Sequence, residues 1–123
     1  MLFVLAAVLA ACGSTAVADT PIVFGINGGN IAPYRVSIQP NGTVEIYASL
    51  GDHPRRALSL ARVRQLTSEI QQAHLANRTC SGALPDVAGR YIRVGGRTVT
   101  VHGPCEPSFS RVWNDLARAV GFG

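Results

Sequence analysis

Apolar and polar residues alternate strictly along two neighbouring stretches, residues 34–39 and 43–49. Alternation with a period of two predicts strands that bury one face. The turn between them contains Asn41-Gly42, a pair that suits the positive backbone φ angles of tight hairpin turns. These two stretches therefore predict a β-hairpin. A short apolar run over residues 22–26 predicts one further strand before it.

A second hairpin is predicted around the Gly95-Gly96 turn, with strands over residues 90–94 and 97–102. A two-residue turn sets which residues face each other: Val94 and Arg97, Ile92 and Val99, Arg90 and Val101. One side of this hairpin then carries the apolar residues Ile92, Val94, Val99 and Val101. The other side carries Tyr91, Arg93, Thr98 and Thr100. Because both strands agree on the apolar side, the register is well determined.

Two stretches place apolar residues three and four positions apart, which is the helical pattern. The first helix is expected from Leu60 to about Leu75, with Ser59 as its N-terminal cap. Its apolar stripe consists of Val63, Leu66, Ile70 and Ala73. The second helix is expected over residues 107–120, with Ser108 as a cap and a proline in its first turn. Its stripe consists of Phe109, Val112, Trp113, Leu116 and Val120.

The order of these elements is β-β-β-α-β-β-α, and residues 50–58 and 77–89 are expected to be loops. An antiparallel sheet of four to five strands, with two hairpins and both helices packed on one face, would bury every apolar stripe at once. The sequence therefore predicts the α+β class and a single domain over residues 19–123.

Residues 1–18 are expected to be a signal segment and not part of the fold. Residues 2–11 form an apolar run that is too short to span a bilayer and typical of a signal peptide. Leu9-Ala10-Ala11-Cys12 resembles the lipobox of bacterial lipoproteins, in which Cys12 would carry the lipid anchor. The alternative is cleavage after Ala18, at an ordinary small-x-small site. The protein is thus expected outside the cytoplasm, as a membrane-anchored lipoprotein or as a secreted protein.

The three cysteines agree with export. Cys12 is used by lipidation or lost with the signal segment, which leaves Cys80 and Cys105 as an even pair. In an oxidising compartment such a pair is expected to form a disulfide. A redox or metal-binding pair would need a Cys-x-x-Cys spacing or a neighbouring cluster of histidines, and this chain has neither. The other alternative is that both thiols stay unpaired.

The net charge of the chain excludes few classes of binding partner. The net charge is +4, and all 11 basic residues are arginines. This excess is too small for a nucleic-acid-binding protein of this length, so no nucleic-acid partner is expected. Guanidinium groups pair well with carboxylates and phosphates, which keeps anionic partners open.

No catalytic, metal-binding or cofactor-binding motif stands out, so an enzyme is not expected. The histidines lack metal-ligand spacing, and the serines lack the contexts of known nucleophiles. The alternative is a small extracytoplasmic hydrolase whose residues converge only in space, for which His53, His102 and Asp86 are the candidates.

The polar side of the second hairpin is the candidate binding site. Tyrosine and arginine are favoured at protein contacts, and Tyr91, Arg93, Thr98 and Thr100 share that side. If both helices cover the other side, these residues are free to meet a partner. The expected function is a non-enzymatic module that binds a macromolecule, either a protein or an anionic polymer of the bacterial envelope.

Two resemblances add to these expectations. Residues 33–38 (PYRVSI) followed by Asn41-Gly42-Thr43-Val44 and a helix resemble small bacterial envelope domains of unknown function. The order Phe24, Gly28-Gly29, helix, Leu84-Pro85, hairpin and helix resembles emfourin-type inhibitors of thermolysin-like metalloproteases. The second resemblance implies a protease-inhibitor role as one form of the binding function.

Overall fold

The computed structural model describes residues 20–30, 32–48, 51–52, 56–83 and 87–121. The lipobox, Cys12 and the alternative cleavage site after Ala18 lie outside these ranges. No helix in the described ranges has the length and hydropathy needed to span a bilayer.

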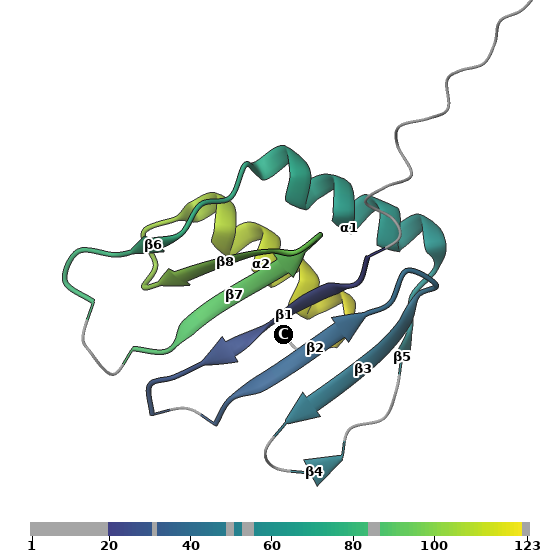
Figure 1. Cartoon of the computed structure of the whole chain (residues 1–123), viewed down its shortest axis with the longest axis horizontal. Coiled ribbons are helices and arrows are strands. Elements are labelled where there is room, and N and C mark those ends of the chain that lie inside the picture. The colour runs from purple at the N-terminus through teal and green to yellow at the C-terminus, as the bar shows by residue number, and fades with distance from the viewer. Residues whose placement is uncertain (1–19, 31, 49–50, 53–55, 84–86, 122–123) are drawn as a thin grey trace, which may run out of the picture.

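The described residues form one sheet with two helices on one side of it (Figure 1). Five longer strands form the body of the sheet: β1 (Ile22–Asn27), β2 (Tyr34–Ile38), β3 (Thr43–Ala48), β7 (Gly89–Val94) and β8 (Arg97–His102). Three strands have two residues each: β4 (Gly51–Asp52), β5 (Arg56–Ala57) and β6 (Arg78–Thr79). The helices are α1 (Leu60–Ala73) and α2 (Pro107–Ala119). The α+β class and the order of the main elements are confirmed.

The predicted number of strands and the purely antiparallel sheet are wrong in detail. Within the described residues the sheet has eight strands in the order β4-β3-β2-β1-β7-β8-β6, with β5 also paired to β3. It is mixed, because β6 runs parallel to β8. The two segments expected as loops, 50–58 and 77–89, contain these extra strands. Two-residue strands form by pairing with an edge that already exists, so they leave no periodic pattern in their own sequence.

The first hairpin, β2–β3, is confirmed together with its Asn41-Gly42 turn. Ile38 pairs with Val44 and Val36 with Ile46. The Asn41 side chain accepts a hydrogen bond from the backbone N–H of Thr43 at 3.0 Å. Gly42 has a φ of +93°, and a Cβ there would lie only 2.1 Å from the Leu58 carbonyl oxygen. Only glycine fits this turn without moving the chain that enters α1.

The second hairpin, β7–β8, also has the predicted register. Val94 pairs with Arg97, Ile92 with Val99 and Arg90 with Val101. The turn glycines both have positive φ, 62° and 81°, as a type I′ turn requires. The strand β1 lies between the two hairpins and pairs with both β2 and β7, which joins them into one sheet.

Both helices begin close to where the sequence places them. The Ser59 hydroxyl accepts a hydrogen bond from the backbone N–H of Arg62 at 3.1 Å, so the expected cap of α1 is confirmed. Ser108 is not the cap of α2. The capping position is Glu106, whose side chain makes no capping bond. The fixed φ of Pro107 places that residue at the first helical position and moves Ser108 into the first turn.

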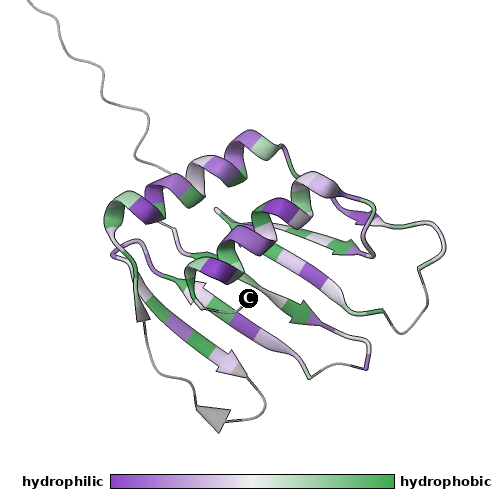
Figure 2. Ribbon diagram, turned by 180° about the vertical axis from the view of Figure 1, so that it is seen from behind, coloured by the Kyte–Doolittle hydropathy of each residue, from purple (hydrophilic) through white to green (hydrophobic). Residues whose placement is uncertain are grey.

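The helices bury unequal parts of their apolar stripes. α2 buries five residues against the sheet: Phe109, Val112, Trp113, Leu116 and Ala117. α1 buries only Val63 and Leu66, while Ile70 and Ala73 further along the predicted stripe are half-buried. Viewed from behind, both helices lie across the same face of the sheet and turn their hydrophilic residues outward (Figure 2).

The core lies between α2 and the central strands. Phe24 on β1 is fully buried, and its ring meets the Trp113 ring edge-on with centroids 5.8 Å apart. Edge-to-face contacts of this kind stabilise a core beyond the area they bury. The position of β1 at the centre of the sheet brings Phe24 directly under α2.

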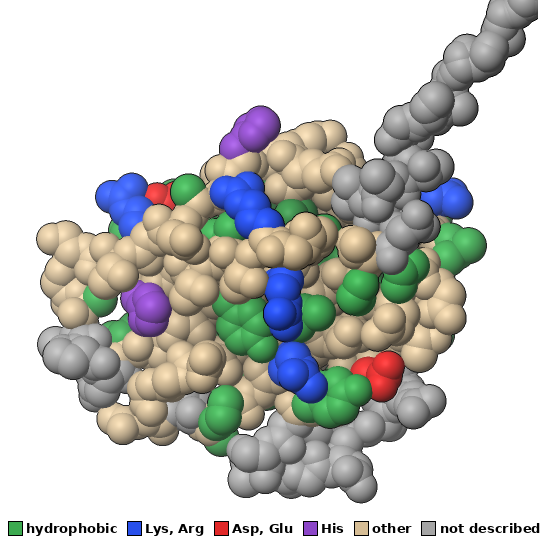
Figure 3. Space-filling view, in the orientation of Figure 1, with side chains coloured by type: hydrophobic (Ala, Val, Ile, Leu, Met, Phe, Trp, Pro, Cys, Tyr) green, Lys and Arg blue, Asp and Glu red, His purple; other side chains and the backbone are tan. Residues whose placement is uncertain are grey.

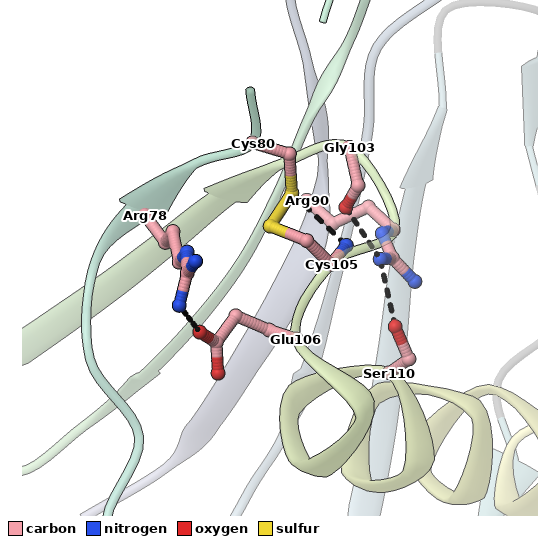
Figure 4. The surroundings of a disulfide bond; sticks show 7 residues. All are labelled: Arg78, Cys80, Arg90, Gly103, Cys105, Glu106 and Ser110. Atoms are coloured by element: carbon pink, nitrogen blue, oxygen red, sulfur yellow. Dashed lines mark hydrogen bonds and ion pairs between the residues drawn. A yellow bond between two sulfur atoms is a disulfide. The ribbon is translucent and has the colours of Figure 1, made fainter. Parts of the chain in front are cut away.

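The predicted disulfide between Cys80 and Cys105 is confirmed, with a sulfur–sulfur distance of 2.05 Å. It ties the segment after β6 to the segment that enters α2 (Figure 4). The Cys80 N–H donates to the His102 carbonyl at 2.8 Å, and Arg78 forms a 2.8 Å ion pair with Glu106 beside the bond. The crosslink thus holds an edge of the sheet next to the start of α2.

Candidate binding face

The sheet has one face covered by the helices and one that they leave uncovered, which we call the open face (Figures 1 and 2). The four residues predicted as a binding site lie on the open face. Tyr91 stands opposite Thr100, and Arg93 stands opposite Thr98, on the neighbouring strands β7 and β8. Arg93 and Thr98 are exposed, whereas Tyr91 and Thr100 are half-buried. Their binding role stays a prediction.

The strand β1 extends this face beside Tyr91. Gly25 on β1 pairs with Tyr91 on one side and with Arg35 on the other. A Cβ at Gly25 would lie 3.0 Å from the Tyr91 hydroxyl and 2.1 Å from the Tyr34 carbonyl oxygen. The absence of a side chain at Gly25 therefore leaves room for the Tyr91 phenol to lie across β1.

Arg35 and Tyr47 belong to the same surface, although neither was among the residues predicted as a binding site. They pair across β2 and β3, with the guanidinium carbon of Arg35 4.6 Å from the centroid of the Tyr47 ring. Tyr47 is 45% exposed, and its hydroxyl donates to the Glu45 carboxylate at 2.8 Å. Alternation had placed Arg35 on the polar side of its strand. The order of the strands could not be predicted from the sequence. That order brings Arg35 next to Gly25 and therefore close to Tyr91.

A shallow hollow of about 330 Å³ lies at this end of the sheet. Its lining includes three tyrosines and one arginine: Tyr34, Tyr47, Tyr91 and Arg35. Aromatic rings with polar tips, together with an arginine, are the residue types that most often dominate binding energy at protein interfaces. The hollow therefore gives the open face a place where a partner's side chain could be anchored.

The arginines of the open face lie on its central strands, Arg35 on β2 and Arg93 on β7. Figure 3 shows basic side chains in a line over the strands, with apolar side chains beside them and one acidic group nearby. Arg35 and Arg93 belong to the strand rows of this face, and so do two acidic residues: Glu45, which pairs with Ser37, and Asp52, which pairs with Tyr47. Neither arginine forms an ion pair with any described residue. This surface is complementary to a partner that carries carboxylates or other anionic groups.

Arg90 belongs to the other, helix-covered side of the sheet. Its guanidinium carbon lies 5.5 Å from the Phe109 ring centroid and 5.6 Å from that of Trp113, and it donates to the Ser110 hydroxyl at 3.0 Å (Figure 4). Burial lowers the pKa of Arg90 from its usual value, and the neighbouring Tyr34 acts in the opposite direction. Arg90 thus closes one end of the core and is not part of the open face.

Burial also governs Tyr34, on the helix-covered side of β2. Desolvation raises the pKa of its phenol to about 12, while the positive charge of Arg90 acts in the opposite direction. The phenol therefore stays neutral at physiological pH. Its ring packs against Trp113 at a centroid distance of 6.3 Å, so its described contacts are those of a residue at the margin of the core.

The residues proposed for a hydrolase are placed only in part. His53 and Asp86 lie outside the described residues. His102 is half-buried at the end of β8. It packs against Gly89: a Cβ added at Gly89 would lie 2.7 Å from the Nε2 atom of His102. In the described ranges, no group of three or more histidine, cysteine, aspartate or glutamate residues could hold a metal ion.

No known protein family matches the chain, and no curated protein matches it either.

Proposed function

We propose that this protein is a non-enzymatic binding module whose open face docks a macromolecular partner outside the cytoplasm. The observation that carries the proposal is the asymmetry of the sheet: both helices cover one face and leave the arginines and tyrosines of the other exposed or half-exposed. A face that served only for solubility would not need two tyrosines and two arginines side by side.

The partner class follows from the chemistry of that face. Arg35 and Arg93 offer guanidinium groups without an ion-pair partner in the described part of the chain, and Tyr47 and Tyr91 offer flat apolar surface with a polar tip. A protein segment with carboxylates, or an anionic polymer of the envelope, would complement this surface.

The proposed location rests on the disulfide. Cys80–Cys105 is a structural bond, and structural disulfides persist in oxidising compartments such as the periplasm or the outside of the cell. In this proposal the protein is anchored through a lipid on Cys12 or, if the chain is cut after Ala18, secreted. The mass of the natural protein separates these two forms.

The test is capture of the partner with variants of matched composition. The double variant Tyr91→Ala with Arg93→Ala should lose a partner that the wild-type protein retains from an envelope extract. The control is Leu60→Ala with Arg64→Ala, which removes an exposed apolar residue and an exposed arginine from α1 on the opposite side. Equal retention by both double variants would remove the open face from consideration.

A protease-inhibitor role is the narrower form of the same proposal. It is supported by the resemblance to emfourin-type inhibitors and by the order of the main elements, three strands, a helix, a hairpin and a helix. The purified protein should then slow a thermolysin-like metalloprotease, and the Tyr91→Ala, Arg93→Ala variant should not. Full protease activity in an excess of wild-type protein would contradict this form while leaving the broader one open to the capture test.

A further inference from the structure

A second potential binding site lies on the helix-covered side, away from the open face. It is a groove of about 530 Å³ between the C-terminal half of α1 and the tip of the β7–β8 hairpin, where α1 runs beside the hairpin (Figure 1). This volume falls within the range of about 300–1,000 Å³ that is typical of small-molecule sites.

The groove exists because α1 is only partly covered by the rest of the protein. The apolar stripe of α1 buries Val63 and Leu66 and then continues to Ile70, which is half-buried and lines the groove. Across from it, Val94 at the end of β7 is also half-buried and lines the groove. Two apolar walls thus face each other with space between them, whereas the same stripe one turn earlier is closed by the core.

The bottom of the groove is apolar as well. Leu75, Ile92 and Val99 line it, and all three are core residues. Gly95 at the hairpin turn leaves its edge open, since a Cβ there would meet no atom within 4 Å. An apolar floor and walls with a few polar groups at the rim are typical of sites for small apolar ligands.

The rim determines the charge of the ligand. Arg97 is exposed and lines the groove, and its guanidinium is held by a 2.5 Å hydrogen bond from Nη2 to the Leu75 carbonyl. A guanidinium has five N–H donors, so further donors remain for an anion. Among the described residues that line the groove, none is an aspartate or a glutamate. An anionic head group is therefore favoured over a cationic one.

We infer that this groove binds a single-chain anionic amphiphile of the fatty-acid type. The acyl chain lies between Ile70 and Val94, and its carboxylate pairs with Arg97. The site uses no residue of the open face, so this inference does not depend on the proposed function.

The test is titration of the purified protein with a fluorescent polyene fatty acid, whose emission rises in an apolar environment. Wild-type protein should show saturable one-to-one binding. Ile70→Trp fills the groove and should weaken binding at least about tenfold, because it removes the space for the chain. Leu60→Trp makes the same addition on the same helix at an exposed site and should bind as the wild type does.

Arg97→Gln tests the head group. It should weaken binding of the fatty acid by roughly threefold or more, as expected for a partly exposed ion pair, and should leave binding of the corresponding neutral alcohol unchanged. Arg93→Gln removes the same charge from the opposite face of the same hairpin and should change neither. Arg97→Gln could instead weaken binding of the acid and of the alcohol equally, or Arg93→Gln could weaken binding of the acid as much as Arg97→Gln does. Either result would overturn the pairing of the carboxylate with Arg97.

A measurement on the wild-type protein covers the case in which a variant fails to fold. In a methyl NMR spectrum, the fatty acid should shift the signals of Ile70, Val94 and Val99 and leave those of Val36 and Val44 in place. Absence of saturable binding by the wild type, or shifts centred on the other hairpin, would overturn the proposal.

Discussion

Replacing Cys80 and Cys105 together by alanine removes the crosslink and changes little else in the fold. Cys80 is only 5% exposed, and alanine avoids placing a hydroxyl in its apolar surroundings. The hydrogen bond from the Cys80 N–H to the His102 carbonyl involves only the backbone and stays possible. Besides the crosslink, the variant loses the hydrogen bond from the Cys105 N–H to the Cys80 sulfur at 3.0 Å, so the crosslink accounts for most of the expected change in stability.

The magnitude follows from the loop that the bond closes. The two cysteines are 25 positions apart. The loss of chain entropy in the unfolded state then corresponds to about 3.5 kcal/mol of stability at 25 °C. The free energy of unfolding of small domains is about 5–15 kcal/mol in total, so the variant should be folded but much less stable. For a domain of about 100 residues the melting temperature should fall by roughly 14–28 °C.

The assay is urea unfolding followed by circular dichroism, with and without a reducing agent. Reductant should lower the stability of the wild-type protein to that of the variant, and should leave the variant unchanged. A loss below about 1 kcal/mol would refute the reasoning, because it would mean that the unfolded chain gains little freedom when the bond is absent.

Three further predictions concern single positions. Gly42→Ala should destabilise the protein by about 1–3 kcal/mol more than Gly28→Ala in urea unfolding. Both glycines have a positive φ, but of the two only Gly42 would place a Cβ against a backbone oxygen, that of Leu58, 2.1 Å away. Equal losses of stability would contradict the close approach to Leu58. The phenol of Tyr34 has a folded-state pKa of about 12 against an ordinary value of 10.0, so its contribution to stability is fully present below pH 10 and is lost as the pH rises towards 12. Tyr34→Phe should flatten this part of the pH profile, and an unchanged profile would count against the raised pKa. Ser59→Ala should cost about 1 kcal/mol through loss of the α1 cap, measured by thermal unfolding, and no loss would contradict the Ser59–Arg62 bond.

The sequence predicted those parts of the fold in which local chemistry and periodicity agree. The register of β7–β8 follows from a two-glycine turn between strands whose apolar sides match, and the structure has that register. The Ser59 cap and the apolar stripe of α2 were predicted for the same reason. In each case the deciding residues are neighbours along the chain.

The remaining features depend on pairing between distant segments. Nothing in residues 22–26 indicates that β1 lies between the two hairpins, yet this placement joins them and puts Gly25 beside both Tyr91 and Arg35. The two-residue strands exist only through their partners. The helical period of α1 likewise predicted a continuous buried stripe, and only the packing of the hairpin tip leaves Ile70 half-buried above the groove.

This dependence explains why half of the candidate binding face was predicted and half was not. Tyr91 and Arg93 stand out from the alternation of a single hairpin. Arg35 and Tyr47 become part of the same surface only through the order of the strands. A site assembled from several strands is therefore visible in the sequence only where one hairpin supplies most of it.

The most direct test of the central claim is site-specific photocrosslinking in the cells that make the protein. A photoreactive amino acid at position 93 on the open face should give a discrete crosslinked product with a partner, and the same amino acid at position 64 on the outer side of α1 should give none. Products at position 64 but none at position 93 would contradict docking through the open face.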